Sequence, residues 1–460
     1  MSPTRKNPLM NVDWITVSIY LAFVIFGWMN IYSAAIDELH PSPFDISQEY
    51  GKQFLFVVIS SLLALTVLYM EGDFFNKFSI PIYALFALLL VLVLAIGTTV
   101  NGAKAWIQIG GFALQPAEFA KIGVSLMLAK YIANTPSRLS GWQARFVAGI
   151  IILIPAALIA LQPDVGSLLT FAAFILALYR EGLSGNILIA GIGGIVLGVV
   201  SVISGFSKID LPFLGERSGV DLLIIIELAL GILFLFLARN NVVPRNRKKV
   251  YWITIGVTIA AASFSYSVNY MIDNVLAPHQ KTRIYVTLGL EEKADAMTNE
   301  VDESGEIKPQ KKKKDPGYNA RMAKIAVGNG GLLGQGFMSG PMTRNKFVPE
   351  RWTDFIFSVI AEEWGFIGST LVIGIFVVLI IRIISLAERQ RSQFSRIYGY
   401  CVASIFFLHL LINVGMVIGL APIIGIPLPF MSYGGSSLIA FTLLLFIFLR
   451  LDAERLSIFR

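Results

Sequence analysis

The run SIPIYALFALLLVLVLAIGTT, Ser79–Thr99, contains no charged residue. A helix needs about 20 apolar residues to cross the hydrocarbon core of a bilayer, so this run predicts a transmembrane helix. Backbone groups in lipid have no water to bind, which leaves helices as the spanning structure for isolated runs. Similar runs recur along the chain and predict an all-α polytopic membrane protein with about twelve transmembrane helices. They lie roughly at 14–34, 53–71, 79–99, 117–133, 146–162, 165–179, 186–206, 221–238, 252–273, 355–381, 397–419 and 435–450.

The composition of the 460-residue chain agrees with this prediction. Hydrophobic residues make up 55% of the chain and charged residues 15%, below the share of about 25% that is usual in soluble domains. The single cysteine, Cys401, excludes a disulfide scaffold. The sequence has no GxxxxGK(S/T) motif and no metal-site spacing among its histidines, which argues against ATP hydrolysis and a histidine-bound metal. In a membrane protein the net charge of +7 marks cytoplasmic loops, so no nucleic-acid partner is expected.

The basic residues of the short loops all fall on one side of the membrane if the chain has about twelve spans. Because short cytoplasmic loops are enriched in Lys and Arg, this side is cytoplasmic and both termini lie there. The loop 276–353 is then extracytoplasmic, and its stretch 291–316 lacks apolar periodicity, as expected of a solvated insertion. The basic residues in question are Arg5, Lys6, Lys77, Arg138, Arg145, Arg180, Arg245, Arg247, Lys248, Lys249, Arg389, Arg391, Arg396, Arg450, Arg455 and Arg460.

Two polar clusters interrupt the apolar runs in the first half of the chain, where ionisable groups at membrane depth are costly and usually functional. Glu118 and Lys121 are three residues apart on one helix face and can pair. The pair is either part of a site or a simple ion pair at a helix end. In the motif QPDVGS, Asp164 follows the helix-breaking Pro163. Asp164 either lines a polar cavity or only caps the next helix.

Two further clusters lie near the C-terminal spans. Glu350, Arg351 and Asp354 crowd the start of the run 355–381. A helix N-terminus favours carboxylates, so Asp354 is either functional or only a partner of the helix dipole. The stretch NVGMVIGLAPIIGIPLPFMSYGGSS, Asn413–Ser437, is rich in Pro and Gly, which predicts a rigid re-entrant loop rather than a simple connector. His409, on an apolar helix, is expected to hydrogen-bond a neighbouring helix.

Taken in order, these motifs resemble the SEDS family of shape, elongation, division and sporulation proteins. The resemblance rests on GAKAWI with QPAEFAK, on QPDVGS, on KIAVGNGGLLGQGF, on PERWTDFIF with AEEWGFIGS, and on the stretch that ends at Ser437. It runs from Asp13 to the last span and implies a SEDS-type helical bundle as a single domain, 1–460. The opening of the chain and the spacing of PER and TDF are more similar to the rod-shape branch than to the division branch. Because the family usually has ten spans, 185–275 is expected to hold an extra pair and 291–316 a longer insertion.

This resemblance implies a peptidoglycan glycosyltransferase of cell elongation. Its substrate would be lipid II, the undecaprenyl-pyrophosphate-linked disaccharide pentapeptide, and its location the bacterial inner membrane. A class B penicillin-binding protein would supply the transpeptidase, together with other elongation-complex proteins. The essential acidic residue of the family's TDF motif maps to Asp354. A β-1,4 linkage made from an α-linked donor implies inversion in one displacement.

The residue types present suit this reaction. A sugar hydroxyl is a weak nucleophile, and a carboxylate such as that of Asp354 can take its proton. The diphosphate leaves as an anion, which Lys104, Lys121, Arg351 or a divalent cation such as Mg or Mn can stabilise; no organic cofactor is expected. The residues predicted to bind substrate are Lys104, Trp106, Glu118, Lys121, Asp164, Glu350, Arg351, Ser432 and Ser436.

Three other functions are compatible with the sequence. Polar residues at helix breaks also occur in transporters, so a lipid II flippase is one alternative. A flippase needs polar residues through the whole membrane depth, whereas here they gather toward the outer face. A scaffold that only positions a synthase is the second alternative, and a division-type paralogue is the third.

Overall fold

The computed structural model describes residues 11–36, 42–100, 103–110, 112–135, 139, 141–205, 208–211, 215–274, 281, 316–421 and 423–455. The chain divides into two compact units, one formed by Met1–Leu183 with Tyr318–Arg460 and the other by Ser184–Gly317. The predicted insertion 291–316 lies outside the described residues except for Pro316, which begins a helix.

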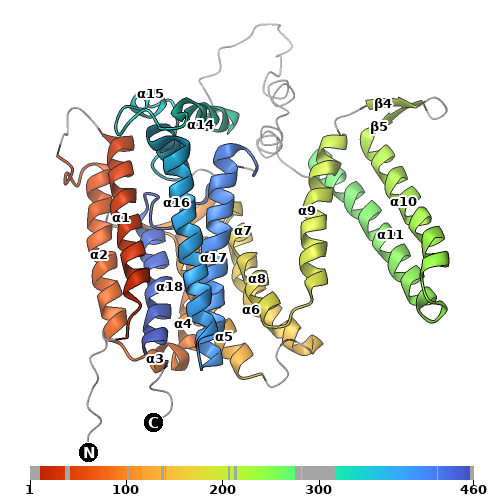
Figure 1. Ribbon diagram of the computed structural model, residues 1–460, viewed down its shortest axis with the longest axis horizontal. Coiled ribbons are helices and arrows are strands. Elements are labelled where there is room, and N and C mark those ends of the chain that lie inside the picture. The colour runs from red at the N-terminus through yellow and green to blue at the C-terminus, as the bar shows by residue number, and fades with distance from the viewer. Residues whose placement is uncertain are drawn as a thin grey trace, which may run out of the picture. The chain divides into compact units, whose positions relative to one another are not determined.

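The first unit is a helical bundle (Figure 1). Helices α17 and α18 form its centre. In their apolar segments 67% and 89% of the residues are buried, whereas only 17% are buried in α4. The helices of this unit are α1 (Trp14–Ala35), α2 (Glu49–Tyr69), α3 (Gly72–Lys77), α4 (Ser79–Ile96), α5 (Pro116–Ala133), α6 (Trp142–Ala160), α7 (Val165–Thr170), α8 (Ala173–Arg180), α14 (Pro316–Gly330), α15 (Pro341–Arg344), α16 (Ile356–Glu388), α17 (Gln393–Ile418) and α18 (Gly435–Ala453).

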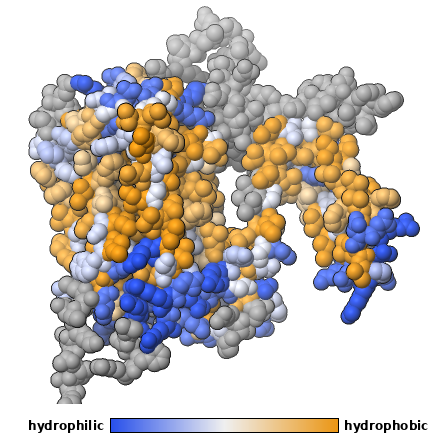
Figure 2. All heavy atoms as spheres, in the orientation of Figure 1, coloured by the Kyte–Doolittle hydropathy of each residue, from blue (hydrophilic) through white to orange (hydrophobic). Residues whose placement is uncertain are grey.

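Each run predicted to span the membrane coincides with a helix or, for 165–179, with the two short helices α7 and α8. Among the described residues, ten helices are long and apolar enough to cross a bilayer. Helix α5 is outside this set and carries Glu118, Lys121 and Lys130. Figure 2 shows apolar side chains around the middle of the first unit and hydrophilic side chains at its two ends. The prediction of an all-α polytopic membrane protein is confirmed, and the count of about twelve spans stays a prediction.

A small antiparallel sheet, which was not predicted, connects α4 to α5. Its strands β1 (Thr98–Val100), β2 (Ala103–Ile109) and β3 (Phe112–Leu114) pair in the order β1–β2–β3. Ala105, Ile107 and Ile109 occupy every second position of the stretch 104–109, which is typical of one face of a strand, so a signal was present in the sequence. The sheet brings β3 against the centre of the bundle, where it contacts α18.

Helix α16 is interrupted at Gly365, whose φ of 66° lies outside the helical region. The loop after α14 fills the interruption with its own backbone: the N–H groups of 335–336 donate to the carbonyls of 362–363, and the N–H groups of 366–367 donate to the carbonyls of 331–332. Broken helices at membrane depth are tolerated only where protein satisfies the freed groups. The second half of the predicted extracytoplasmic loop 276–353 is therefore a folded cap, in which α14 and α15 lie across one end of the bundle (Figure 1).

The described residues of the second unit form the helices α9 (Gly185–Gly205), α10 (Gly219–Asn241) and α11 (Pro244–Asn274) and the antiparallel strands β4 (Lys208–Leu211) and β5 (Gly215–Ser218). Polar contacts join the helices. The Ser201 hydroxyl donates to the Ser265 carbonyl at 2.8 Å, and the Ser265 hydroxyl donates to Glu227 at 2.7 Å. These three helices occupy the region 185–275, which was expected to hold an extra pair of spans. That they are additional to the family stays a prediction.

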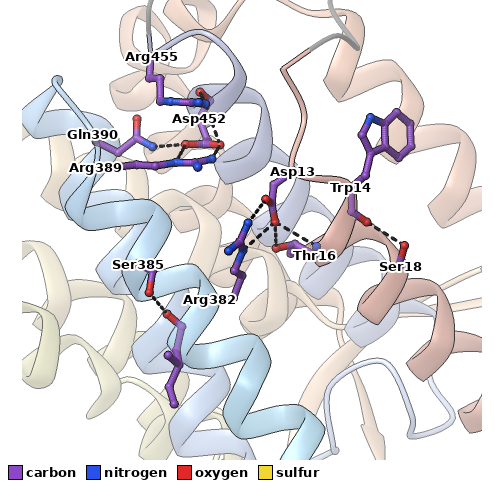
Figure 3. Close-up of polar contacts among 11 residues, drawn as sticks. Asp13, Trp14, Thr16, Ser18, Arg382, Ser385, Arg389, Gln390, Asp452 and Arg455 are labelled. Atoms are coloured by element: carbon purple, nitrogen blue, oxygen red, sulfur yellow. Dashed lines mark hydrogen bonds and ion pairs between the residues drawn. The ribbon is translucent and has the colours of Figure 1, made fainter.

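Ion pairs lock the helix ends at the side of the first unit opposite the cap (Figure 3). Asp13 caps α1 and accepts hydrogen bonds from Arg382 of α16 at 2.5 and 3.2 Å. Burial alone would raise the pKa of Asp13, but the hydrogen bonds from Arg382 and the first turn of α1 lower it to about 2. Asp452 of α18 is fully buried and pairs with Arg389 at 2.5 Å, and Gln390 donates to it at 2.6 Å. The charges at this end tie α1, α16 and α18 together.

Removing the Asp452 carboxylate should destabilise the bundle. Asp452→Ala removes a fully buried acceptor from the buried Gln390 and from Arg389, whose side chain is 37% exposed. Loss of hydrogen bonds to a charged group typically costs about 1–3 kcal/mol. We expect a lower apparent unfolding temperature in detergent, measured by scanning fluorimetry. Asp73→Ala is the matched control, because the Asp73–Lys77 pair is 58% and 71% exposed and such pairs contribute about 0–1 kcal/mol. Equal shifts for both variants would contradict the structural role of Asp452.

Candidate active site

The motif PERWTDF folds into a tight turn, 349–355, directly before α16. The turn closes on the carbonyl of Glu350, which has a positive φ of 51°. Arg351 anchors it to α1: its Nε donates to the Ala34 carbonyl at 2.6 Å, and its guanidinium lies 4.6 Å from the centre of the Trp352 ring. The Trp352 carbonyl accepts a hydrogen bond of 2.8 Å from the N–H of Tyr433. The turn is thus held by α1 on one side and by the loop before α18 on the other.

Asp354 ends this turn, and its side chain is partly exposed. Within the described part of the chain, no group donates a hydrogen bond to its carboxyl. Burial, followed by the negative charges of Glu350 and Asp164, raises the pKa of Asp354 to about 7. Glu350 and Asp164 are therefore both close enough to Asp354 for their charges to act on its carboxyl. A carboxyl with this pKa is suited to accept a proton near neutral pH.

Asn413 of α17 fixes the backbone of Asp354. Its fully buried amide donates to the Asp354 carbonyl at 2.8 Å and to the Ile426 carbonyl at 2.7 Å. Gly425 has a φ of +74°, and a Cβ built there would stand 3.0 Å from Oδ2 of Asp354. Asn413 thereby joins the Asp354 turn to the loop beside it. It was not among the predicted site residues, although a buried amide in an apolar run was a signal for it.

Asp164 directly precedes α7, which packs against the same loop. It caps α7 by accepting the N–H of Ser167 at 3.0 Å, and Gln115 donates to its other oxygen at 2.9 Å. A Cβ built on Gly166 would stand 2.7 Å from the Ile424 carbonyl, so α7 packs backbone against backbone on the loop. The expectation that Asp164 caps a helix is confirmed. Its contact with substrate stays a prediction.

A buried charge cluster lies beneath the loop. Lys121 donates to both carboxylate oxygens of Glu118 at 2.9 Å, and Nε2 of His409 lies 2.9 Å from the same ammonium group. The Nδ1 atom of His409 donates to the Pro427 carbonyl at 3.1 Å. The predicted Glu118–Lys121 pair and the predicted contact of His409 with another helix are both confirmed. Because all three residues are 2% exposed or less, the cluster supports the loop from inside the bundle.

The two predicted serines hold the C-terminal end of the re-entrant segment. The Ser436 hydroxyl donates to the Ala113 carbonyl at 3.0 Å and accepts the N–H of Gln115 at 3.1 Å. The Ser432 hydroxyl accepts the N–H of Leu428 at 2.8 Å. These contacts tie the segment to β3, to the start of α5 and to itself.

Lys104 and Trp106 lie in β2. The Lys104 ammonium donates to the carbonyls of Leu94 and Ala95 at 2.7 and 3.1 Å, which satisfies the C-terminal carbonyls of α4. Its backbone N–H donates to the Gln162 carbonyl at 3.1 Å and brings the sheet to the QPD motif. Trp106 is half-buried in the same strand. Of the predicted substrate-binding residues, Asp164, Glu350 and Arg351 lie around the Asp354 turn or its loop, whereas Lys104 and Trp106 lie in the neighbouring sheet.

Comparison with protein families places this arrangement among known proteins. The model of the cell cycle protein family FtsW/RodA/SpoVE matches residues 13–210 and 223–456. The peptidoglycan glycosyltransferase RodA of Treponema pallidum (strain Nichols) is 31% identical over 94% of this chain and 96% of its own length. The peptidoglycan glycosyltransferase MrdB of Escherichia coli (strain K12) is 26% identical over 95% and 93%. The probable peptidoglycan glycosyltransferase FtsW of Dichelobacter nodosus is 28% identical over 95% and 88%.

Solved structures share the fold. A chain from a peptidoglycan synthase complex, studied for the coordination of polymerization and crosslinking, superposes with a TM-score of 0.62 at 23% identity, over 97% of this chain and 99% of that one. The rod shape determining protein RodA of Thermus thermophilus superposes with a TM-score of 0.58 at 22% identity, over 98% and 99%. At these identities the likeness concerns the fold alone.

Proposed function

The chain belongs to the SEDS family of cell cycle proteins, the family of FtsW, RodA and SpoVE, and we propose that it is a peptidoglycan glycosyltransferase of the rod-shape type. The identity of 31% to a RodA glycosyltransferase, against 28% to an FtsW, favours the rod-shape branch that the sequence motifs predicted. The chain is a multi-pass membrane protein. We propose lipid II as its substrate and glycan strands for cell elongation as its product.

The reaction joins two lipid-linked sugars. The hydroxyl oxygen of the acceptor sugar forms a bond to the anomeric carbon of the donor, and the bond from that carbon to the diphosphate oxygen breaks. The hydroxyl proton passes to a base, and the bonding pair leaves with the lipid diphosphate. A single displacement inverts the donor, so that an α-linked sugar becomes β-linked.

The observation that carries the assignment of the base is the setting of Asp354. Its backbone is fixed by Asn413, and the turn is fixed by Arg351, yet its carboxyl accepts no hydrogen bond from the described residues. Positioned proton transfer of this kind contributes about 10²–10⁴ in rate. A carboxyl that only interacted with the dipole of α16 would not require the hydrogen bonds from Asn413 and Arg351 that fix its position.

Stabilisation of the departing diphosphate requires positive charge. The cations predicted for this role already have protein partners: Lys104 binds the end of α4, Lys121 binds Glu118, and Arg351 binds the end of α1. Among the described residues no group of three His, Cys, Asp or Glu side chains could hold a metal ion. Magnesium is commonly bound by one or two carboxylates together with substrate phosphates. We therefore propose that Asp164 and Glu350 would hold Mg or Mn only when the diphosphate is also bound. The metal ion would then neutralise the charge of the diphosphate.

We propose a bacterial inner-membrane location with both termini in the cytoplasm. The ion-paired end of the first unit would then face the cytoplasm, and the Asp354 turn would face outward. A class B penicillin-binding protein and other elongation-complex proteins are the proposed partners. The SEDS-like chain of the peptidoglycan synthase complex supports this by its fold.

Asp354→Asn should abolish polymerisation. Asparagine keeps the shape and the helix-capping ability of aspartate but cannot take a proton, so a capping role predicts nearly full activity. Purified protein is incubated with lipid II, with and without a class B penicillin-binding protein, and the polymer is resolved by gel electrophoresis. Asp73→Asn at an exposed position is the control. Normal polymer from Asp354→Asn would refute the assignment, and lipid movement without polymer from the wild type would favour the flippase.

The acid limb of the pH–rate profile should move when Glu350 is neutralised. The reactive form of Asp354 is deprotonated, so the rate should rise as the pH passes through about 7. The Glu350 charge helps to raise that pKa. Glu350→Gln should therefore lower the pKa of Asp354 and shift the limb to lower pH in kcat/KM measurements on lipid II. If the acid limb of the profile does not move, it reports the titration of a group other than Asp354.

Asn413 should act as a positioning residue. Asn413→Ala frees two carbonyls next to Asp354, and a displacement of about 1 Å at a reacting group can cost about a hundredfold in rate. We expect kcat to fall by about tenfold to a hundredfold while KM stays within about twofold. Tyr398→Phe is the control. Tyr398 lies on the same helix as Asn413, and the change removes a single buried hydrogen bond, which Tyr398 donates to the Leu444 carbonyl. A similar loss of kcat in both variants would indicate general damage rather than positioning.

A further inference from the structure

The turn between α10 and α11 in the second unit carries a concentration of positive charge that the proposed reaction does not use. No acidic residue occurs between Glu227 and Asp273, so the turn has no carboxylate of its own. Among the described residues, no carboxylate from elsewhere in the chain pairs with its basic side chains. The basic residues of the turn are Arg239, Arg245, Arg247, Lys248 and Lys249.

Four of these five charges lie where the helix itself disfavours them. Helix α11 begins at Pro244, has no acidic residue in its first turn, and carries the four basic residues of 245–249 in its first two turns. The N-terminus of a helix bears partial positive charge and N–H groups without partners in the helix, so it favours carboxylates and opposes cations. An anion from outside the chain would remove this repulsion, because it could accept hydrogen bonds from the N–H groups and from the basic side chains.

The basic residues share one face of α11 with an exposed tryptophan. Arg245, Lys248, Lys249 and Trp252 follow the spacing i, i+3, i+4, i+7, which places them on the same side of the helix. All four are exposed, and Trp252 is 75% exposed. Arg247 lies off this face and has a structural contact, because its Nε donates to the Val242 carbonyl at 2.9 Å. The free cations of the face therefore end at an aromatic ring.

Beyond Trp252 the same face is apolar. Ile255 and Ile259 continue the spacing and are 37% and 57% exposed. Figure 2 shows hydrophilic side chains at the tip of α10 and α11 and apolar side chains along both helices. Both helices are long and apolar enough to cross a bilayer, and tryptophan prefers the boundary between headgroups and hydrocarbon. The rise from Arg245 to Lys249 is about 6 Å, which matches a headgroup layer of about 5–8 Å.

We propose that this face of α11 binds an anionic phospholipid such as phosphatidylglycerol. The phosphate accepts hydrogen bonds from Arg245, Lys248 and Lys249, and an acyl chain lies along Trp252 and the isoleucines beyond it. Basic residues that only set the orientation of the loop would need to lie on one side of the membrane, but they would not need to share a helix face with Trp252. A soluble anion would use the cations but not the apolar part of the face.

The test follows the fluorescence of Trp252 in the purified full-length protein in detergent. Phosphatidylglycerol with brominated chains, which quench nearby tryptophan, is titrated against phosphatidylethanolamine with the same chains. The signal of Trp252 is the difference from the same chain carrying Trp252→Phe. We expect phosphatidylglycerol to quench Trp252 at a concentration at least tenfold lower than phosphatidylethanolamine does. High salt should weaken only the phosphatidylglycerol response, because it screens the charges.

The variant Arg245→Gln/Lys248→Gln/Lys249→Gln removes the charges of the face and keeps Arg239 and Arg247, so the loop stays basic. A basic residue near anionic lipid contributes about fivefold in affinity, so we expect the affinity for phosphatidylglycerol to fall tenfold or more and that for phosphatidylethanolamine to stay unchanged. Arg245→Lys/Lys248→Arg/Lys249→Arg is the matched control. It preserves every charge and should keep the affinity within about threefold.

Several outcomes would overturn the proposal, and none of them requires catalytic activity. Equal quenching by the two lipids would show that ordinary lipid covers the face without selection. An equal loss in the Gln variant and in the charge-preserving control would show that charge does not determine binding. Release of phosphatidylglycerol by inorganic phosphate at the same concentration would identify a site for free anions, and release by an acidic peptide would identify a protein-docking site.

Discussion

A polar group buried in a membrane domain must find its partner inside the protein, and this constraint accounts for most of the architecture around Asp354. Lys121 has no exposed surface, and it is neutralised by Glu118 and hydrogen-bonded to His409. Lys104 and Arg351 donate hydrogen bonds to the free carbonyls at the ends of α4 and α1. Unsatisfied groups at these positions would each cost several kcal/mol in hydrocarbon. Lys104, Lys121 and Arg351, which were predicted to bind the substrate, therefore also stabilise the fold.

The same constraint explains how irregular backbone survives between the spans. The interruption of α16 at Gly365 is bridged by the loop after α14. The re-entrant segment is held by Asn413, by His409 and by the two serines at its C-terminal end. Each anchor removes freedom from the segment that flanks Asp354. Against this background the carboxyl of Asp354, which accepts no bond from the described residues, stands out. A rigid frame around an unsatisfied acid is the arrangement expected where a ligand completes the hydrogen bonding.

Much of the fold could be predicted because its signals are local. Uncharged runs give the helices, and the spacing of Glu118 and Lys121 gives their pairing. The sheet between α4 and α5 was missed because its strands are short and lie among apolar spans. Asn413 was missed for another reason: an amide in an apolar run shows that a partner exists but not which one. Only the fold reveals that its partners are the carbonyls of Asp354 and Ile426, which are distant in sequence. Distances of this kind depend on packing, to which one sequence gives no direct access.

The two ends of the first unit suit a one-sided reaction. At the end opposite the cap, the Asp13–Arg382 and Asp452–Arg389 pairs tie α1, α16 and α18, and breaking hydrogen bonds to these two buried carboxylates costs about 1–3 kcal/mol each. An alternating-access transporter would have to open that end in each cycle, so its inward-open state would be rare without a further source of energy. A glycosyltransferase needs no such opening. Its substrates arrive by their lipid chains from the side and react at one face, which requires a fixed acid beside a cleft open to the bilayer. The ion pairs that close one end and the anchored Asp354 turn at the other agree with a reaction at one face.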